Sequence, residues 1–176
     1  MDLNHFGVCW FAIQVRARHE HICASLLRNK GYRDFLPLSL ERGSNGLRGA
    51  VRYRITERPL YPGYVFCQFD PNVRAAIVTT PGVLRIVGTG TTAVSIPNAE
   101  IEAIRSVTCT GLPRYPVPYV RVGDQVKIVE GPLKGVTGIL ARVKGQNRFV
   151  LSIHLLQRSV AVEVNASWTE QAETDT

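Results

Sequence analysis

Three prolines and one glycine fall within the ten residues TGLPRYPVPY at positions 110–119. Proline lacks a backbone N–H and fixes its own φ angle, so this composition disfavours a helix or a central strand and is typical of a linker. Strand-like and helix-like runs alternate before it, whereas only short β-rich runs follow it. A chain of 176 residues can hold two small domains. We therefore predict a domain over residues 8–109, a linker over 110–119, a second domain over 120–168 and a frayed tail over 169–176.

The first domain combines strands with two helices. The β-branched and aromatic run VCWFAIQV at 8–15 predicts a buried strand. RHEHICASLLRNKG at 18–31 has helical spacing and ends at a glycine that can adopt the left-handed conformation. Its apolar residues share one face: Ile22, Cys23, Leu26 and Leu27. A second helix is predicted within IPNAEIEAIRSV at 96–107. An antiparallel sheet with flanking helices makes this domain α+β.

The second domain contains turns at regular spacing between short alternating runs. Such a pattern predicts a small β-sandwich or β-barrel. Its local preference is for strands rather than helices, because residues 148–164 are rich in β-branched side chains.

Arginines gather in the segment LERGSNGLRGAVRYRITERP at 40–59, which we expect to form a hairpin or a mobile loop. Arg52 and Arg54 alternate with apolar residues, so one side of the second arm is basic. The alternatives for this face are contact with phosphates and ordinary solvated charge.

Composition restricts the function classes. The net charge of +7 and the pI near 9.6 favour a polyanionic partner, although such a charge also serves solubility. We expect a cytoplasmic protein, because neither a membrane-spanning apolar run nor a secretory signal is present. No catalytic constellation or phosphate loop is evident, so we predict neither an enzyme nor a cofactor.

The four cysteines are widely scattered, at positions 9, 23, 67 and 109, without a CxxC pair. This spacing predicts neither a metal site nor a disulfide framework. Three of them lie in apolar patterns, so we expect buried free thiols.

The segment RPLYPGYVFCQF at 58–69 carries four aromatic residues on and beside one short strand. On an extended strand, Tyr64 and Phe66 point to one side and Val65, Cys67 and Phe69 to the other. The pattern leaves two alternatives open, a strand buried on both sides or one aromatic side available for binding.

The second domain carries spaced residues that resemble the KOW motif of the NusG family: Gly123, Asp124, Gly131, Pro132, Gly135 and Gly138. The first domain resembles the NusG N-terminal domain in the order of Trp10–Phe11, Gly31, Pro37, PLYPGYVF, TTPGV and IPNAEIEAI. The two ordered motif sets cover roughly residues 8 to 168. We therefore expect an N-terminal α+β domain joined by a proline-rich linker to a small SH3-like β-barrel.

This resemblance implies an elongation or antitermination factor that binds RNA polymerase and suppresses pausing. Its aromatic residues would grip the clamp helices of the largest polymerase subunit, and in this chain they correspond to Trp10, Tyr61, Pro62, Tyr64 and Phe66. Basic residues Arg16 and Arg18 would contact nucleic acid, in particular the non-template DNA strand, with ordinary solvated charge as the alternative. Arg52 and Arg54 are the further nucleic-acid candidates, from the hairpin pattern alone.

The resemblance also implies a second partner for the barrel, either the termination helicase Rho or a small-subunit ribosomal protein. Leu133 and Val136 stand where housekeeping members often carry aromatics, which leaves this partner open. The arginine-rich central hairpin is more similar to the specialised, RfaH-like branch than to general NusG. We expect a monomer with no membrane association. The alternative from another class is a ribosome- or RNA-binding module that acts through the barrel.

Overall fold

The computed structural model describes residues 8–45, 52–120, 123–143 and 146–172, with side chains except those of residues 40–45, 52–56, 143, 146, 147 and 166. An N-terminal antiparallel sheet with helices precedes a C-terminal antiparallel sheet, which confirms the predicted α+β class. The chain divides into two compact units. The first contains the chain through Leu36, Tyr61–Glu102 and Ile153–Leu156, and the second contains Pro37–Leu60, Ala103–Ser152 and the chain from Gln157.

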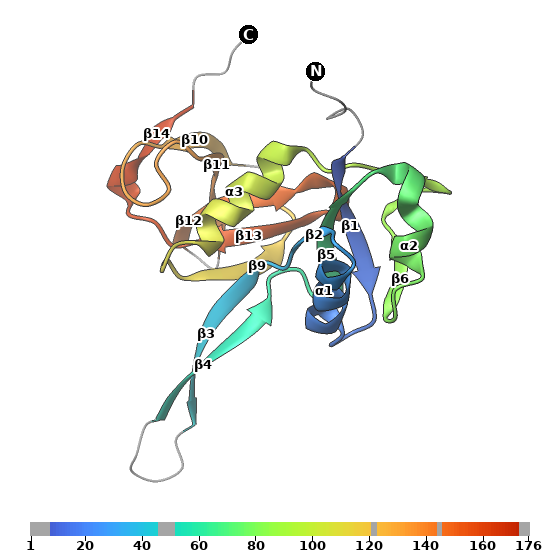
Figure 1. Cartoon of the computed structure of the whole chain (residues 1–176). Coiled ribbons are helices and arrows are strands. Elements are labelled where there is room, and N and C mark those ends of the chain that lie inside the picture. The colour runs from blue at the N-terminus through green and yellow to red at the C-terminus, as the bar shows by residue number, and fades with distance from the viewer. Residues whose placement is uncertain (1–7, 46–51, 121–122, 144–145, 173–176) are drawn as a thin grey trace. The chain divides into compact units, whose positions relative to one another are not determined.

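The first unit is built on a four-stranded sheet in the order β2-β5-β1-β6. Its strands are β1 (Cys9–Val15), β2 (Arg33–Phe35), β5 (Tyr64–Phe69) and β6 (Val83–Ile86). The helical elements α1 (Glu20–Asn29), η1 (Pro71–Val73) and α2 (Arg74–Val78) belong to the same unit, and Figure 1 shows α1 and α2 beside the strands. A short pair, β7 (Gly88–Thr89) and β8 (Thr92–Ala93), precedes α3 (Asn98–Thr108).

One face of this sheet carries the hydrophobic core of the first unit. Phe11, Ile13 and Val15 of β1 pack with Val65, Cys67 and Phe69 of β5. The helices cover them with Cys23, Ala24, Leu27 and Ile77. The predicted helical face is wrong at one position, because Ile22 is 53% exposed and Ala24 is buried instead. Gly31, with φ of 88°, follows α1 as expected.

The predicted hairpin is confirmed as β3 (Leu38–Asn45) paired with β4 (Arg52–Pro59). The pairing runs from Leu38 opposite Pro59 to Asn45 opposite Arg52. The tip, residues 46–51, lies outside the described residues.

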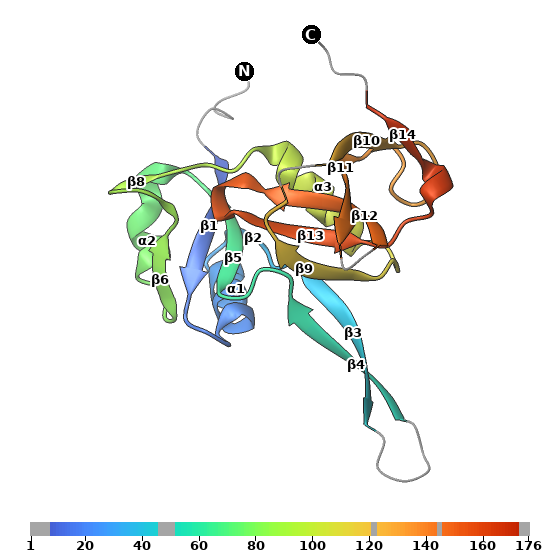
Figure 2. The ribbon, with the colours of Figure 1, turned by 180° about the vertical axis from the view of Figure 1, so that it is seen from behind.

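The second unit contains a six-stranded sheet in the order β14-β10-β11-β12-β13-β9 (Figure 2). Its strands are β9 (Arg114–Pro118), β10 (Asp124–Ile128), β11 (Thr137–Val143), β12 (Gln146–Ile153), β13 (Arg158–Val162) and β14 (Thr169–Gln171). The short turns η2 (His154–Leu156) and η3 (Ala166–Trp168) follow β12 and β13.

Two segments expected to lack regular structure form edge strands of this sheet. β9 lies within the expected linker, and its prolines are tolerated because an edge strand needs ladder hydrogen bonds on one side only. β14 lies within the expected frayed tail and pairs with β10. The boundaries predicted for the two domains stay a prediction.

Arg114 organises the start of β9. Its buried guanidinium donates to the backbone carbonyl oxygens of Thr110 at 2.9 Å and Leu38 at 2.9 Å. It also donates to the carbonyls of Thr108 and Leu112, both at 3.3 Å. A cation beside the last carbonyls of α3 complements the negative end of the helix dipole. Burial lowers the pKa of Arg114 from its ordinary value, and the four carbonyls stabilise the charge that remains.

Within the described residues, no helix is long and apolar enough to span a membrane.

The close packing around Gly138 in β11 predicts that a larger residue at this position lowers the stability of the protein. A Cβ at this position would lie 2.7 Å from the ring of Phe149 and 2.8 Å from the carbonyl oxygen of Val150. We expect Gly138→Ala to lower the free energy of unfolding by about 1–3 kcal/mol, measured by urea denaturation. Gly111→Ala is the matched control, because its Cβ would meet nothing within 4 Å. Equal effects of the two substitutions would contradict this packing.

Of the three cysteines in apolar patterns, Cys23 and Cys67 are buried as expected, but the expectation is wrong for Cys9, which is exposed; Cys109 is exposed as well. Burial, with a contribution from the Asp34 charge, raises the pKa of Cys67 to about 12. Burial also raises the pKa of Cys23, whose thiol lies 3.4 Å from the Pro81 carbonyl oxygen.

We predict that a thiol reagent modifies Cys9 and Cys109 rapidly in the native protein and all four cysteines in denaturant. The pattern should persist at pH 9.5, because a pKa of about 12 keeps Cys67 protonated and because both Cys67 and Cys23 are buried. Mass spectrometry of labelled peptides measures the order of reaction. Rapid native labelling of Cys67 would show that the core of the first unit opens readily.

Candidate protein-binding face

The register between β1 and β5 sorts their side chains into two sets. Opposite one another lie Trp10 and Gln68, Ala12 and Phe66, and Gln14 and Tyr64. Residues opposite each other in an antiparallel pair point to the same side of the sheet, and this side is not the one that carries the helix-covered core. The register therefore places Trp10, Tyr64 and Phe66 on one face, which residue spacing alone left undecided.

Neighbouring rings connect these residues. Trp10 and Phe35 meet edge to face with centroids 6.5 Å apart, and Phe35 lies 6.2 Å from Phe66. Phe66 in turn meets Tyr61 edge to face at 5.3 Å. We call Trp10, Phe35, Tyr61, Tyr64 and Phe66 the aromatic face. Nothing in the sequence pattern singles out Phe35, because β2 is only three residues long and shows no period.

A tight turn presents Tyr61 and Tyr64. The Tyr64 N–H donates to the Tyr61 carbonyl at 3.0 Å, and the Gly63 carbonyl accepts from the Val15 N–H at 2.9 Å. Gly63 has a φ of 84°, a conformation that glycine adopts without strain. Its N–H donates to Oε1 of the buried Glu20 at 2.8 Å.

Glu20 is a functional candidate that sequence reasoning missed. Its position in the first turn of α1 is where the helix dipole favours an acidic residue, so spacing offers no sign of a bond to a turn 43 residues away. By holding the Gly63 amide, Glu20 ties the position of the turn to α1.

The family resemblance implied an aromatic side available for binding, and in the structure most of that side is buried. Trp10 is 3% exposed, Tyr61 1% and Phe66 0%. Tyr64 is half-buried and Pro62 is exposed. The structure thus brings Trp10, Tyr61, Tyr64 and Phe66 together but leaves only Tyr64 and Pro62 accessible. Their role in binding stays a prediction.

The Tyr61 hydroxyl is buried without a hydrogen-bond partner among the described residues. Burial and, to a lesser degree, the Glu100 carboxylate raise its pKa far above the ordinary value, so the hydroxyl stays protonated. A buried hydroxyl without a partner destabilises the conformation that contains it.

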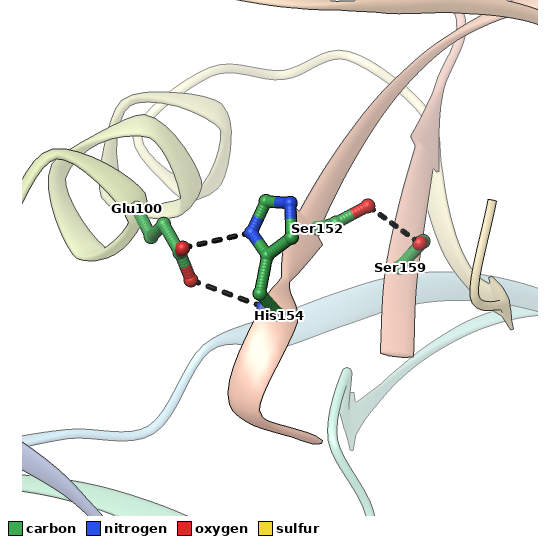
Figure 3. Close-up of polar contacts among 4 residues, drawn as sticks. All are labelled: Glu100, Ser152, His154 and Ser159. Atoms are coloured by element: carbon green, nitrogen blue, oxygen red, sulfur yellow. Dashed lines mark hydrogen bonds and ion pairs between the residues drawn. The ribbon is translucent and has the colours of Figure 1, made fainter. Parts of the chain in front are cut away.

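Glu100, in the first turn of α3, forms its hydrogen bonds with His154 (Figure 3). The Nδ1 atom of His154 lies 2.8 Å from Oε1 of Glu100, and the His154 backbone N–H donates to Oε2 at 3.2 Å. Both residues belong to the first unit. In the second unit the hydroxyls of Ser152 and Ser159 lie 2.7 Å apart, as the same figure shows.

The predicted nucleic-acid contacts occupy two places. Arg16 and Arg18 are exposed in the loop between β1 and α1, where the Arg16 N–H donates to the Gly82 carbonyl at 2.8 Å. Arg18 has a φ of 64°, which is uncommon for a residue other than glycine. Arg52 and Arg54 lie in β4 opposite Asn45 and Gly43, but their side chains are outside the description.

Arg85 is a further basic residue beside the aromatic face, and residue spacing in the sequence did not indicate its position there. It lies opposite Gln14 in the pairing of β6 with β1, and its Nε donates to the Gln14 Oε1 at 2.7 Å. This pairing places an exposed cation on the same side of the sheet as the aromatic face.

The predicted KOW residues lie in and around the β10–β11 hairpin. Asp124 begins β10, and Gly138 lies in β11 opposite Val126. Gly131 and Gly135 have φ values of 78° and 91° in the connecting turn. A Cβ at Gly131 would lie 2.8 Å from the Trp168 ring, so this glycine permits the turn to approach the indole closely.

Comparisons with known proteins agree with this architecture. Residues 8–105 match the family model described as transcription termination factor nusG. The transcription termination/antitermination protein NusG of Thermus thermophilus is 30% identical over 137 residues, which cover 72% of this chain and 74% of that protein. NusG of Pseudomonas aeruginosa is 28% identical over 123 residues, with coverage of 67% and 70%.

A solved structure concerning domain interaction in Thermotoga maritima NusG has the same fold, with a TM-score of 0.56 and 20% identity over 94% of this chain and 98% of that one. The family match covers more than half of the chain, and the Thermus relative reaches 30% identity over most of it. The chain therefore belongs to the NusG family of transcription termination and antitermination proteins.

Proposed function

We propose that this chain binds RNA polymerase through the aromatic face and suppresses pausing during elongation. The clamp helices of the largest polymerase subunit are the proposed contact. Family membership supports a role in transcription. The observation that carries the choice of surface is the register of β1 with β5, which sets Trp10, Tyr64 and Phe66 apart from the helix-covered core.

The chemistry of this face suits an apolar helical partner. Aromatic side chains bury a large area with few rotatable bonds, which is why they are enriched among binding hot spots. The turn that carries Tyr61 and Tyr64 is held by the Val15 and Glu20 hydrogen bonds, so little conformational freedom is lost on binding. Because Trp10, Tyr61 and Phe66 are buried here, binding through all of them requires a conformational change that uncovers them.

Pause suppression needs no catalysis. A protein that binds the elongating state of polymerase more tightly than the paused state shifts the population toward elongation. The proposal places this action in the cytoplasm, with the chain acting as a monomer.

Arg16 and Arg18 are the proposed contacts to the non-template DNA strand. Both are exposed, and the Arg16 N–H bond to the turn at Gly82 holds their loop beside the sheet. Phosphate contacts of this kind add affinity that falls with salt.

The C-terminal sheet is the proposed site for a second partner, either Rho or a small-subunit ribosomal protein. Leu133 is fully buried and supports the β10–β11 turn from within, so it is not a contact residue in this conformation. Val136 is partly accessible in the same turn. A specialised role, as in the RfaH-like branch, is also a proposal; it is supported only by the arginine-rich β3–β4 hairpin.

Tyr64 tests the polymerase contact, because it is partly accessible, lies in β5 and is among the residues that the family resemblance assigns to binding. We expect Tyr64→Ala to weaken binding to core polymerase by at least tenfold, measured by fluorescence titration of the full chain. Leu84→Ala is the matched control, since Leu84 is a 54% exposed apolar residue on the same sheet. Unchanged binding by Tyr64→Ala would refute this surface. RNA binding that ignores Tyr64 and falls steeply with salt would instead favour the RNA-binding alternative.

The DNA contact predicts a change in salt dependence. Replacing Arg16 and Arg18 by Gln should reduce the slope of log affinity against log salt by about 1.4 for elongation complexes with a single-stranded non-template segment, at about 0.7 per phosphate. The control variant, Lys127→Gln with Arg142→Gln, removes the same charge from exposed positions of the second unit. If both variants change the slope equally, the effect is one of net charge and the loop has no specific role.

A further inference from the structure

Arg85 lies in a row with Gln14 and Tyr64 at one end of the aromatic face. β1 lies between β5 and β6 in the first sheet (Figure 2), and Gln14 pairs with Tyr64 on one side and with Arg85 on the other. Val83 and Ile86, which flank this position on β6, pack against the helix-covered core instead. The three side chains of the row therefore project from the same side of the sheet as the aromatic face.

This row is the accessible end of the face. Arg85 is exposed, and Gln14 and Tyr64 are half-buried, whereas Trp10 and Phe66 are almost fully buried. A partner that approaches the face in this conformation therefore meets the row first. The row offers that partner a cation, an amide and an aromatic ring.

Gln14 holds the Arg85 guanidinium in a fixed orientation. The Nε atom of Arg85 donates to Oε1 of Gln14 at 2.7 Å. Within the described residues, Nη1 and Nη2 of Arg85 have no hydrogen-bond partner. Because a guanidinium is planar, a bond at Nε also sets the direction of its remaining N–H groups. These groups match the two oxygens of a carboxylate, which they bind through parallel hydrogen bonds.

We propose that Arg85, positioned by Gln14, binds a carboxylate on the partner helix that contacts Tyr64. The row then selects a helix that carries an acidic residue beside its apolar surface. This inference rests on the proposed polymerase contact, and it assigns to Arg85 an aspartate or glutamate of the clamp helices.

The spacing of the sheet indicates where this acidic residue lies. Neighbouring strands are about 4.8 Å apart, so Tyr64 on β5 and Arg85 on β6 are separated by about 10 Å across β1. A helix that crosses the strands rises about 1.5 Å per residue, which places the acidic residue about seven positions from the apolar residue at Tyr64. Positions seven apart lie on the same face of a helix, so one helix can occupy both sites.

Phosphate is the other anion that a guanidinium binds through two hydrogen bonds. The exposed Arg16 and Arg18 lie in the loop that is bonded to Gly82, close to the start of β6. The hydrogen bond to Gln14 favours the carboxylate, because it holds the guanidinium over β1, beside the ring that contacts the partner protein. Contact with DNA phosphates is therefore an outcome of the test and not the proposal.

Charge reversal in the full chain tests the contact. We expect Arg85→Gln to weaken binding to core polymerase by about fivefold, the upper end for an exposed ion pair, as measured by fluorescence titration. Arg85→Glu should weaken it by about thirtyfold, because repulsion is added to the lost bonds. Replacing the contacted acidic residue of the clamp helices by lysine should restore the affinity of Arg85→Glu but not that of Arg85→Gln.

Arg33→Gln is the matched control. Arg33 is an exposed arginine that pairs with Gln68 at the far end of the same side of the sheet. Its replacement removes the same charge, and we expect a change in affinity of less than about twofold at this distance from the row. Equal losses in Arg33→Gln and Arg85→Gln would show an effect of net charge and overturn the proposal.

Gln14→Leu tests the positioning role, because it keeps the Arg85 charge and removes the acceptor of the Nε bond. We expect binding to weaken by about threefold in this variant and by no further amount when it is combined with Arg85→Gln. Equal losses from Gln14→Leu in both backgrounds would contradict a role that acts through Arg85.

The remaining outcomes separate this inference from the proposed function. Loss of binding in Tyr64→Ala with unchanged binding in Arg85→Glu would overturn the inference and leave the proposed function intact. An Arg85 effect confined to elongation complexes with a single-stranded non-template segment would assign Arg85 to DNA phosphates and also overturn it. Loss in Arg85→Glu alone, restored by the clamp-helix lysine, would support the carboxylate contact and refute that of Tyr64. No polymerase binding by the wild type would refute both.

Discussion

Antiparallel pairing of β1 with β5 is the constraint on which the rest of the first unit depends. Because side chains alternate along a strand, one register decides the side of every residue on both strands. Under the helices, one face carries Phe11, Ile13 and Val15 of β1 together with Val65, Cys67 and Phe69 of β5. Trp10 and Phe66 lie on the opposite face. A slip of one residue would bury the wrong set and expose the core. The same pairing thus provides both stability and a second, aromatic face.

That second face combines a rigid frame with side chains that are largely buried. The Gly63 turn is anchored by Glu20 from α1 and by Val15 from β1, so its geometry follows from the sheet. The rings of Trp10, Phe35, Phe66 and Tyr61 then form a continuous row. Yet three of these side chains are almost fully buried, and one of them carries an unsatisfied hydroxyl. A buried hydroxyl without a partner lowers the stability of the conformation in which these rings are covered.

Much of this was predictable, because local patterns report on local structure. The α+β class, the β3–β4 hairpin and α1 follow from periodicity and turn residues, and family membership confirms that the chain is not an enzyme. Burial of Cys9 was wrongly expected, since its place at the first position of β1 lies outside the packed part of the strand. The β9 and β14 strands were missed because pairing with distant partners overrides weak local preference. Glu20, Phe35 and the Glu100–His154 contact join residues far apart in sequence, which no spacing rule reveals.

Site-specific photo-crosslinking tests the central claim most directly. A photoreactive phenylalanine analogue at position 64 of the full chain would be irradiated with core RNA polymerase, and the crosslinked peptides identified by mass spectrometry. The account predicts crosslinks from position 64 to the clamp helices of the largest subunit, with few from the same analogue at exposed position 84. Crosslinks that arise equally from both positions, or only from a probe placed in the C-terminal sheet, would contradict it.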